Sequence, residues 1–515
     1  MQGIYGMPSF IRFTREICPD LNSDIKMMFD KLKQLTKDTG VYGISTIIGR
    51  FLTFILTPYY THVFGRSDFG IFTNFYAFIG IFSVVFIYGM DAAYLKFASK
   101  PVIGDKKDNF STPYLFVFFV GIIISGIIFL FQSPVYSLLD ISSQYSYLMK
   151  YVIGILFIDS ICVIPFLTLR LEHKAKKFAA FKLINIITNV ILNVYLISKL
   201  KMGVEAIFIS NIIASLTCFI LLVPTVAVNL RFKTHYDLLK RLLKFGLPYF
   251  PAGLAAMMIQ SIDRPILTHL TDLSTSGLYS ANYKLGIFMM LFVNMFQYAW
   301  QPFFLQNAED KNAKEMFAKV LTYFTITAGF ILVILSLFIE DLAKIHFANR
   351  TIIGAAYLSG LNIVPVVLFG YMFLGIYTVF TVGIFIKEKS IYVPVITGIG
   401  AAVNIGTNFL LIPVMGIMGA ALATLAAYFV MAVIYFFVTQ RFYKINYEYA
   451  KLAKIFLSIF IVAFIYYIQQ LNGFLTLTNK FLMLLLFVIL LFVFNIGREE
   501  FIFLKKRLSR QSAKK

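Results

Sequence analysis

Residues 418–440 read MGAALATLAAYFVMAVIYFFVTQ, a run without a single charged side chain. The run is long enough to cross the hydrocarbon core of a bilayer, which takes about 20 mostly apolar residues. Comparable runs recur along all 515 residues, of which 59% are apolar and only 14% are charged. Water-soluble globular chains do not have this composition. The sequence therefore predicts an all-α integral membrane protein of about fourteen transmembrane helices.

The expected spans lie between charged or turn-rich breaks. They cover residues 41–63, 69–93, 112–131, 147–169, 179–198, 205–230, 245–268, 277–304, 316–339, 361–386, 391–411, 418–440, 455–470 and 480–497. We expect them to form two pseudo-symmetric six-helix lobes followed by two C-terminal helices. The corresponding segments are 1–40 (cytoplasmic N-terminal segment), 41–230 (first lobe), 231–244 (cytoplasmic linker), 245–440 (second lobe), 455–497 (helices 13 and 14) and 498–515 (basic cytoplasmic tail).

Two echoes between the halves of the chain support this division. Pro58-Tyr-Tyr-Thr-His62 resembles Pro265-Ile-Leu-Thr-His269, and at the same offset Gly70-Ile-Phe resembles Gly277-Leu-Tyr. The pair Asn189 and Asn193 is likewise echoed by Asn404 and Asn408, each pair being followed by a glycine-containing turn. Because both similarities occur, and in the same order in each half, they favour an internal duplication.

The residues that give the formal net charge of +21 lie mainly in the loops and tails. Most Lys and Arg fall in every second loop and in both tails, which the positive-inside rule assigns to the cytoplasm. This distribution predicts a multi-pass protein of a bacterial cytoplasmic membrane with both termini inside, and it accounts for the charge through anionic lipids without nucleic acid. The first 40 residues show no cleavable signal peptide. Residues 1–26 have no evident role, and translation could instead start at Met27 or Met28.

Five ionisable residues fall inside the expected spans, namely Arg50, Asp159, Asp263, Arg264 and Lys284. Each costs roughly 2.5–3.5 kcal/mol at the centre of a helix that faces lipid, so such residues usually face the protein interior or an aqueous cavity. Together they carry a net positive charge, which suits an anionic cargo group such as a pyrophosphate. We therefore expect Arg50, Arg264 and Lys284 to line a central cavity.

Helix rise predicts which of these charges meet. Arg50 and Asp159 are expected at the same depth, and Asp263 and Lys284 at similar depths of consecutive antiparallel helices. Because Asp263 and Arg264 point about 100° apart on a helix, we expect Asp263 to pair with Lys284 and to leave Arg264 unpaired. Structural ion pairs, or snorkelling of Arg264 and Lys284 to an interface, are the alternatives.

Polar and helix-breaking residues complete the candidate site. Gln260, Asn282, Asn294, Gln297 and Gln301 could bond sugar hydroxyls or merely join packed helices. Asp91 and Lys96, with residues 297–300 in the second half, could gate the inner mouth or form ordinary solvated helix ends. Pro248, Pro251 and Pro265, with Gly246 and Gly253, predict a bent seventh span. His62 and His269 could relay protons or cap helix ends.

Several stretches resemble the oligosaccharide flippases of the multidrug/oligosaccharidyl-lipid/polysaccharide exporter superfamily. They are KDTGVYGISTIIGR at 37–50, PYYT at 58–61, FGIF at 69–72 and IDR at 262–264. The resemblance covers about residues 30–490 and implies translocation of a lipid-linked, polyprenyl-pyrophosphate oligosaccharide by alternating access, for cell-surface polysaccharides such as lipopolysaccharide. Expected partners are this substrate, membrane lipids and polysaccharide polymerase or assembly proteins.

Two other functions stay open. The first is a cation-coupled multidrug exporter on the same fold. The second is a membrane polymerase or ligase. The short outer loops and the absence of an Asp-x-Asp sequence argue against it. No phosphate-binding loop, metal site or catalytic constellation is evident, so we expect a protein that is not an enzyme and needs no cofactor. Coupling to protons or sodium remains open, as do the glycan carried and the oligomeric state.

Overall fold

The computed structural model describes residues 54–99, 103–347 and 350–496. Thirteen expected spans coincide with described helical segments, and the first is described from residue 54 onward. Ten helical segments in these ranges are individually long and apolar enough to cross a bilayer, and a bent pair of helices adds an eleventh. Of the other three expected spans, the eighth is interrupted at residues 284–286, the fourteenth is shorter, and the first lies partly outside the described residues. The prediction of an all-α integral membrane protein with two lobes and two C-terminal helices is confirmed.

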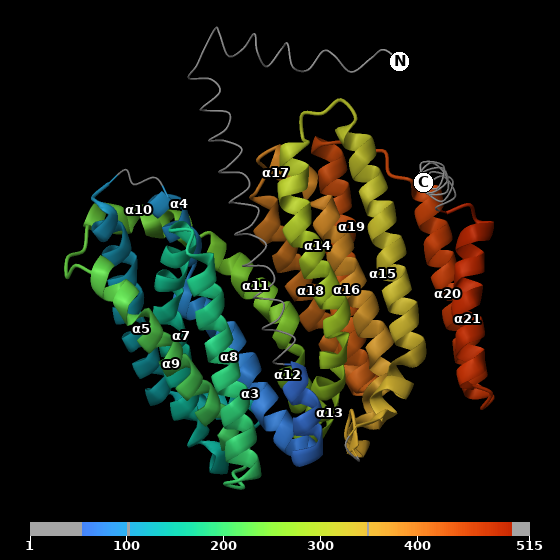
Figure 1. The fold of residues 1–515 in the computed structure, drawn as a ribbon, viewed down its shortest axis with the longest axis horizontal. Helices are drawn as coiled ribbons and strands as arrows, with labels where there is room; N and C mark the ends of the chain where they lie inside the picture. The colour runs from blue at the N-terminus through green and yellow to red at the C-terminus, as the bar shows by residue number, and fades with distance from the viewer. Residues whose placement is uncertain (1–53, 100–102, 348–349, 497–515) are drawn as a thin grey trace, which may run out of the picture.

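The helices of the first half alternate in direction through the bundle (Figure 1). They are residues 54–63, α3 (Arg66–Ile87), α4 (Met90–Ser99), α5 (Lys106–Leu130), α6 (Gln132–Leu139), η1 (Ser143–Tyr145), α7 (Leu148–Leu171), α8 (Ala175–Ser198) and α9 (Glu205–Asn229).

The second half follows with more breaks. Its elements are α10 (Tyr236–Gly246), α11 (Tyr249–Ser261), α12 (Asp263–Leu270), α13 (Leu273–Tyr283), η2 (Lys284–Gly286), α14 (Ile287–Gln306), α15 (Ala313–Lys344), β1 (His346–Phe347), β2 (Arg350–Thr351), η3 (Ala355–Ile363), α16 (Val364–Phe380), α17 (Val382–Ile386), α18 (Tyr392–Met415), α19 (Ile417–Phe442), α20 (Tyr449–Leu471) and α21 (Leu477–Val493).

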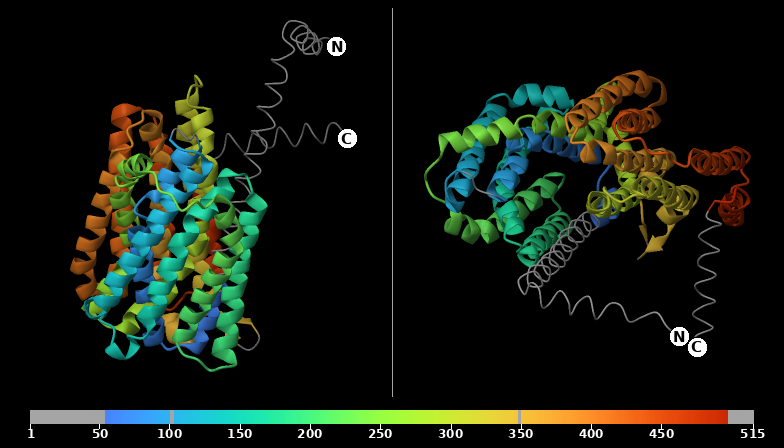
Figure 2. Two further views of the ribbon diagram at one scale, coloured as in Figure 1. Left: turned by 90° about the vertical axis from the view of Figure 1, so that its left-hand side faces the viewer. Right: turned by 90° about the horizontal axis from the view of Figure 1, so that it is seen from above.

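The two halves form two helix groups that stand apart at one end of the molecule and meet at the other (Figures 1 and 2). The end that carries α4, α10 and α17 is called the α10 end. The opposite end, with the antiparallel β1–β2 hairpin, is called the hairpin end. Helix α11 runs between the groups and packs against α3 of the first and α18 of the second. The pair α20–α21 lies outside the second group, against α15.

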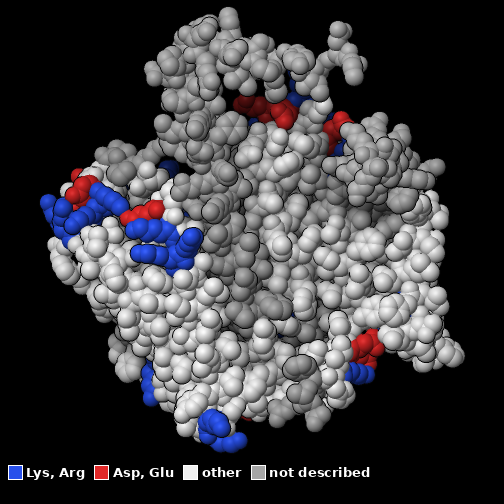
Figure 3. All heavy atoms as spheres, viewed as in Figure 1, with Lys and Arg blue, Asp and Glu red and all other residues white. Residues whose placement is uncertain are grey.

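Burial follows the position of each helix in the bundle. The segment Ala355–Ile386 is 67% buried in its apolar window and forms the core of the second group, whereas α8 is only 17% buried. Large apolar side chains such as Leu130, Leu410 and Val414 are exposed. Figure 3 shows Lys and Arg gathered towards the two ends, with a broad uncharged band between them. A band of this kind is stable in lipid, where apolar side chains need no protein cover.

Helix breaks occur where the sequence carries glycine and proline. The axes of α10 and α11 differ by 44°, with Pro248 at the junction, and a second break separates α11 from α12 at Ile262. The predicted bend of the seventh span is confirmed. The segment expected as a plain linker contains the amphipathic helix α10, which buries Leu238 and Leu242.

One of the sequence similarities between the two halves is also seen in the structure. Asn193 Nδ2 in α8 donates to Asn189 Oδ1 at 3.0 Å, and Asn408 Nδ2 in α18 donates to Asn404 Oδ1 at 3.2 Å. Helices α8 and α18 are the fifth members of their respective groups, so the same local contact recurs at equivalent positions. The two-residue strands β1 and β2 depart from the expected all-helical chain, and they lie in the connection between α15 and η3.

Candidate functional site

The two helix groups are sealed together at the hairpin end by a glycine contact between α3 and α13. A Cβ added to Gly70 would lie 2.0 Å from Leu273 O, and one added to Gly277 would lie 1.9 Å from Arg66 O. No side chain fits at such distances, so the backbones of the two helices touch. These glycines are the repeat-equivalent pair seen in the sequence. We call this contact, with the bonds around it, the seam.

Hydrogen bonds between the two groups surround the glycine contact. Buried Asn74 Nδ2 donates to Thr268 Oγ1 at 2.9 Å and to Ser276 Oγ at 3.2 Å. The Tyr357 hydroxyl donates to Phe64 O at 2.8 Å, and Arg66 Nε donates to Ala356 O at 2.5 Å.

The two repeat-equivalent histidines also bond across the seam. His62 Nε2 lies 2.6 Å from Thr351 O, and His269 Nδ1 lies 2.7 Å from Asp140 Oδ2. Each histidine therefore joins its own group to the other. The proton-relay hypothesis for this pair stays untested.

Buried and exposed bonds of the seam should differ in strength. We expect Asn74→Ala to destabilise the sealed end by about 1–3 kcal/mol because it removes a buried amide and leaves its hydroxyl partners with fewer bonds. His269→Ala removes an exposed pair, with side-chain exposures of 63% and 41%, and should cost at most about 1 kcal/mol. Spin labels at exposed Ser143 and Ala355 on the two groups measure the sealed fraction. Equal effects of the two variants would contradict this ranking.

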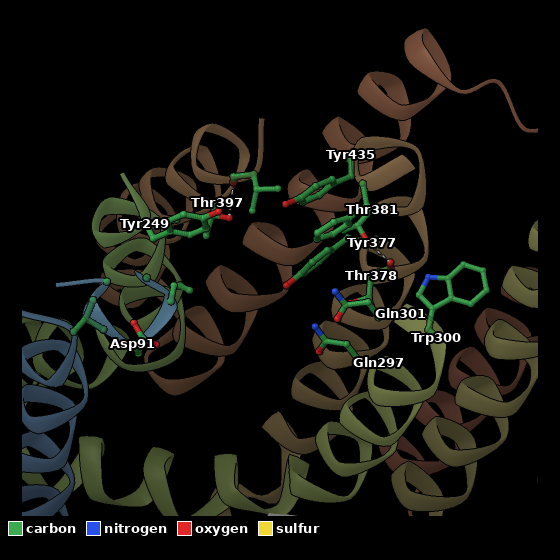
Figure 4. Close-up of a pocket in the computed structure, with 18 of the residues that line it drawn as sticks. Asp91, Tyr249, Gln297, Trp300, Gln301, Tyr377, Thr378, Thr381, Thr397 and Tyr435 are labelled. Carbon is green, nitrogen blue, oxygen red and sulfur yellow. Dashed lines mark hydrogen bonds between the residues drawn. The ribbon is translucent and has the colours of Figure 1, made fainter. Parts of the chain in front are cut away.

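A cleft of about 490 Å³ opens between the groups at the α10 end (Figure 4). Its lining comprises Ser83, Val84, Ile87, Gly89, Asp91, Ala92, Tyr249, Ala252, Gly253, Ala256, Gln297, Trp300, Gln301, Phe304, Tyr377, Thr378, Thr381, Phe385, Val393, Thr397 and Tyr435. The amides of Gln297 and Gln301 and the rings of Tyr377 and Tyr435 approach from one side, and Asp91 and Tyr249 from the other. The size is typical of a ligand-binding pocket.

Two of the expected site residues, Asp91 and Gln297, lie in this cleft, and so does the sugar-bonding candidate Gln301. Lys96 closes α4, and its ammonium lies 3.9 Å from the centre of the Phe245 ring. Pro251 and Pro265 lie in α11 and α12 respectively. None of these three lines the cleft.

The charged residues of the seventh span form a different pair from the expected one. Arg264 Nη1 lies 3.1 Å from Asp263 Oδ1, and the Tyr279 hydroxyl donates to Asp263 Oδ2. The prediction that Asp263 pairs with Lys284 and leaves Arg264 unpaired is wrong. The angular argument considered only the directions in which the two side chains leave the helix, whereas the long Arg264 side chain turns back towards the neighbouring carboxylate.

Lys284, unlike Arg264, has no acidic partner in the part of the chain that the structure describes. It lies in η2, where the eighth span is interrupted, and its ammonium is 5.1 Å from the ring centres of Phe69 and Phe72. Its side chain is partly exposed. Aromatic faces stabilise a cation without pairing with it as a carboxylate does, so no acidic side chain among the described residues competes with another anion for Lys284.

The remaining candidates lie apart from this group. Arg50 lies outside the described residues, so its expected pairing with Asp159 is untested. Asp159 in α7 interacts electrostatically with Lys182 of α8. The backbone carbonyl of Gln260 accepts a bond from Arg264 at 2.6 Å. Asn294 Nδ2 is buried without a hydrogen-bond partner among the described residues, and Asn282 bonds to Tyr357 O at 2.9 Å.

Sequence reasoning missed the tyrosines of the site. Tyr279 holds Asp263, and Tyr249, Tyr377 and Tyr435 line the cleft. The spacing of Tyr279 and Tyr283 by four residues next to a charged helix break was an available signal. No comparable pattern distinguishes the cleft tyrosines among the 30 tyrosines of the chain.

Residues 62–350, more than half of the chain, match a family described as "Polysaccharide biosynthesis protein". The chain belongs to this family. A comparison with curated proteins finds no match. The resemblance to flippases and exporters that was drawn from the sequence is confirmed.

Solved structures show the fold of this polysaccharide biosynthesis family member. A lipid II flippase, MurJ, in an inward closed conformation is 16% identical, with 89% of this chain and 99% of that chain covered and a TM-score of 0.71. An inward-facing multidrug resistance transporter of the MATE family and MOP superfamily is 11% identical, with 76% and 94% covered and a TM-score of 0.62. A mutant of the MATE transporter VcmN of Vibrio cholerae is 14% identical, with 79% and 96% covered and a TM-score of 0.55.

Proposed function

We propose that this protein is a flippase that moves a lipid-linked, polyprenyl-pyrophosphate oligosaccharide across a bacterial cytoplasmic membrane by alternating access, for cell-surface polysaccharide biosynthesis. One observation carries the proposal: a cleft lined by both polar and apolar side chains lies between two helix groups whose described residues form the seam at the hairpin end. A transporter that exposes its site to one side at a time requires a cleft of this kind. Family membership supports the same function.

The proposed cycle exchanges the open and the sealed end. The α10 end would face the cytoplasm together with both chain termini, and the hairpin end would face outward. Residues 41–230 and 245–440 would move as two units joined by the linker at 231–244. Since α11 contacts both groups, its junction with α10 at Pro248 is the natural place for the change in angle.

The cargo would enter with its sugars in the cleft and its lipid tail in the bilayer. Lys284, with Arg50, would hold the pyrophosphate, because a cation without an acidic partner binds phosphate more strongly than one already paired. Arg264 would act through its pair with Asp263 rather than as a free cation. Membrane lipids and a polysaccharide polymerase or assembly protein are the proposed partners.

Removing the unpaired cation tests this function. We expect Lys284→Ala to lower the flipping rate of a labelled polyprenyl-pyrophosphate oligosaccharide in vesicles at least about tenfold, whereas Lys284→Arg retains most of it, since a charge-assisted bond contributes about 1.5–3 kcal/mol. Lys199→Ala at the exposed end of α8 is the matched control. A Lys284→Ala variant that inserts well and flips the substrate at the normal rate would contradict the assignment of Lys284 to the pyrophosphate.

A cation-coupled drug exporter is the second candidate, because Asp91 shares the cleft with several aromatic side chains. A carboxylate beside aromatic faces also suits an organic cation. The same vesicles, loaded with a cationic dye, separate the two functions. Dye efflux without movement of the sugar lipid would favour the exporter.

A further inference from the structure

One wall of the cleft is polar but uncharged. It is formed by α14, α16, α18 and α19 and by Thr381 between α16 and α17, and its polar residues are Gln297, Gln301, Tyr377, Thr378, Thr381, Thr397 and Tyr435. The amides of Gln297 and Gln301 point into the open space (Figure 4). They make no hydrogen bond to any residue that the structure describes. An amide without a partner offers both donors and an acceptor to a ligand.

Two tyrosines add hydroxyls to this wall, and of their rings Tyr377 is partly exposed whereas Tyr435 is buried. The rings of Tyr377 and Tyr435 are stacked, with their centres 5.2 Å apart and their planes 11° from parallel. Both hydroxyls point towards the space opposite Asp91 and Tyr249. A tyrosine presents an apolar face and a polar tip. Sugars have the complementary character, with C–H groups on the faces of the ring and hydroxyls around its edge.

The opposite wall contributes a single charge. Asp91 is the one charged residue among the described residues that line the cleft, and no ion pair or hydrogen bond within the described ranges engages its carboxylate. An unpaired carboxylate at a cleft with low-dielectric walls repels anions more strongly than it would in water. Lys284, over Phe69 and Phe72 towards the seam, is not among the lining residues. The uncharged wall and the free cation are therefore separate parts of the molecule.

We propose that the uncharged wall is the sugar subsite, and that Asp91 makes it select neutral and amino sugars against acidic sugars such as uronic acids. The inference rests on the proposed flippase function and names the class of glycan that the same site accepts. Gln297 and Gln301 bond the hydroxyls, the partly exposed Tyr377 contacts the sugar, and Asp91 excludes a second negative charge from the cleft.

The chain contains its own reporter for this subsite. Trp300 is the only tryptophan of the 515 residues, and it lines the cleft. Fluorescence titration of the purified full-length protein in lipid nanodiscs therefore reports changes at the wall of the cleft that carries Trp300. Three probes are compared: farnesyl diphosphate, farnesyl-diphosphate-linked N,N′-diacetylchitobiose, and the same compound with a terminal glucuronic acid. Radiolabelled versions measure binding independently of fluorescence.

The wild-type protein should bind the neutral sugar probe at least about tenfold more tightly than the glucuronate probe, because the carboxylates repel across the cleft. Asp91→Asn should reduce that difference to about threefold or less, and Asp91→Glu should preserve it. Gln297→Ala should weaken the neutral probe about tenfold through lost hydrogen bonds and leave farnesyl diphosphate unchanged. Gln306→Ala, on the same helix but outside the lining, is the matched control.

Three different results would contradict the inference. If both sugar probes bind with equal affinity, or the glucuronate probe binds more tightly, the sugar selection is wrong while the flippase function stands. If none of the diphosphate probes binds by either measurement and a cationic dye quenches Trp300 in an Asp91-dependent manner, the flippase function fails too. Loss of binding by Gln306→Ala equal to that by Gln297→Ala would refute the assignment of the amide.

Discussion

Gly277→Ala is expected to prevent closure of the hairpin end and to abolish transport. The new methyl group would lie 1.9 Å from Arg66 O and 2.8 Å from Gly70 N, and both are backbone atoms that cannot turn aside. Overpacking typically costs about 1–3 kcal/mol, and a rigid backbone contact belongs at the upper end of that range. The sealed fraction should fall at least about tenfold, and spin labels at Ser143 and Ala355 should report longer distances.

The control for this variant is another helical glycine. Gly398 in α18 has nothing within 4 Å of an added Cβ, so Gly398→Ala should leave both the distances and the transport rate unchanged. Gly70→Ala should reproduce the effect of Gly277→Ala, because the contact is mutual. A Gly277→Ala protein with wild-type distances and normal transport would show that the seam is not a tight backbone contact.

Asp263→Ala is expected to destabilise the protein by about 3–5 kcal/mol. The carboxylate is fully buried, pairs with Arg264 and accepts a bond from Tyr279. Removing one partner of a buried ion pair leaves the other charge without compensation, which is the costly case. The native cysteines provide the measurement: Cys162 and Cys218 are buried and free. In a Cys18→Ser background, a thiol-reactive dye therefore reports thermal unfolding.

Removing both charges distinguishes the contribution of the ion pair to stability from that of the packing around it. Asp263→Ala combined with Arg264→Met should regain much of the lost stability, because no unpaired charge remains. Lys284→Ala should scarcely change the unfolding temperature, since that lysine has no acidic partner among the described residues. If the double variant is as unstable as the single one, the ion pair is not the source of the effect.

The seam and the charged pair lie close together along the chain, and this proximity has a consequence for transport. Thr268 and Ser276 take part in the seam through Asn74, and their hydroxyls also donate to the backbone carbonyl of Arg264, at 3.1 and 3.3 Å. Opening of the hairpin end would therefore disturb the support of Arg264. A cargo anion near Lys284 and the closure of the seam can be coupled through this short network.

The sequence alone determined the class of the protein and the position of its spans. Whether a segment crosses the membrane depends on the summed hydropathy of about 20 residues. A sum over so many residues changes little with any single position. The repeated motifs at Gly70 and Gly277 were visible as well. Their contact was not, because sequence similarity does not say that equivalent positions meet across the molecule.

Only the tertiary structure decided which side chains are partners. Asp263 bonds to its neighbour Arg264 and to Tyr279, which lies on the next helix, α13. The cleft likewise combines Asp91 and Tyr249 with Gln297 and Tyr435 from distant helices. Hydropathy is a local property of each segment. A binding site depends on the orientation, bending and spacing of whole helices. This arrangement is set by packing between segments far apart in the chain.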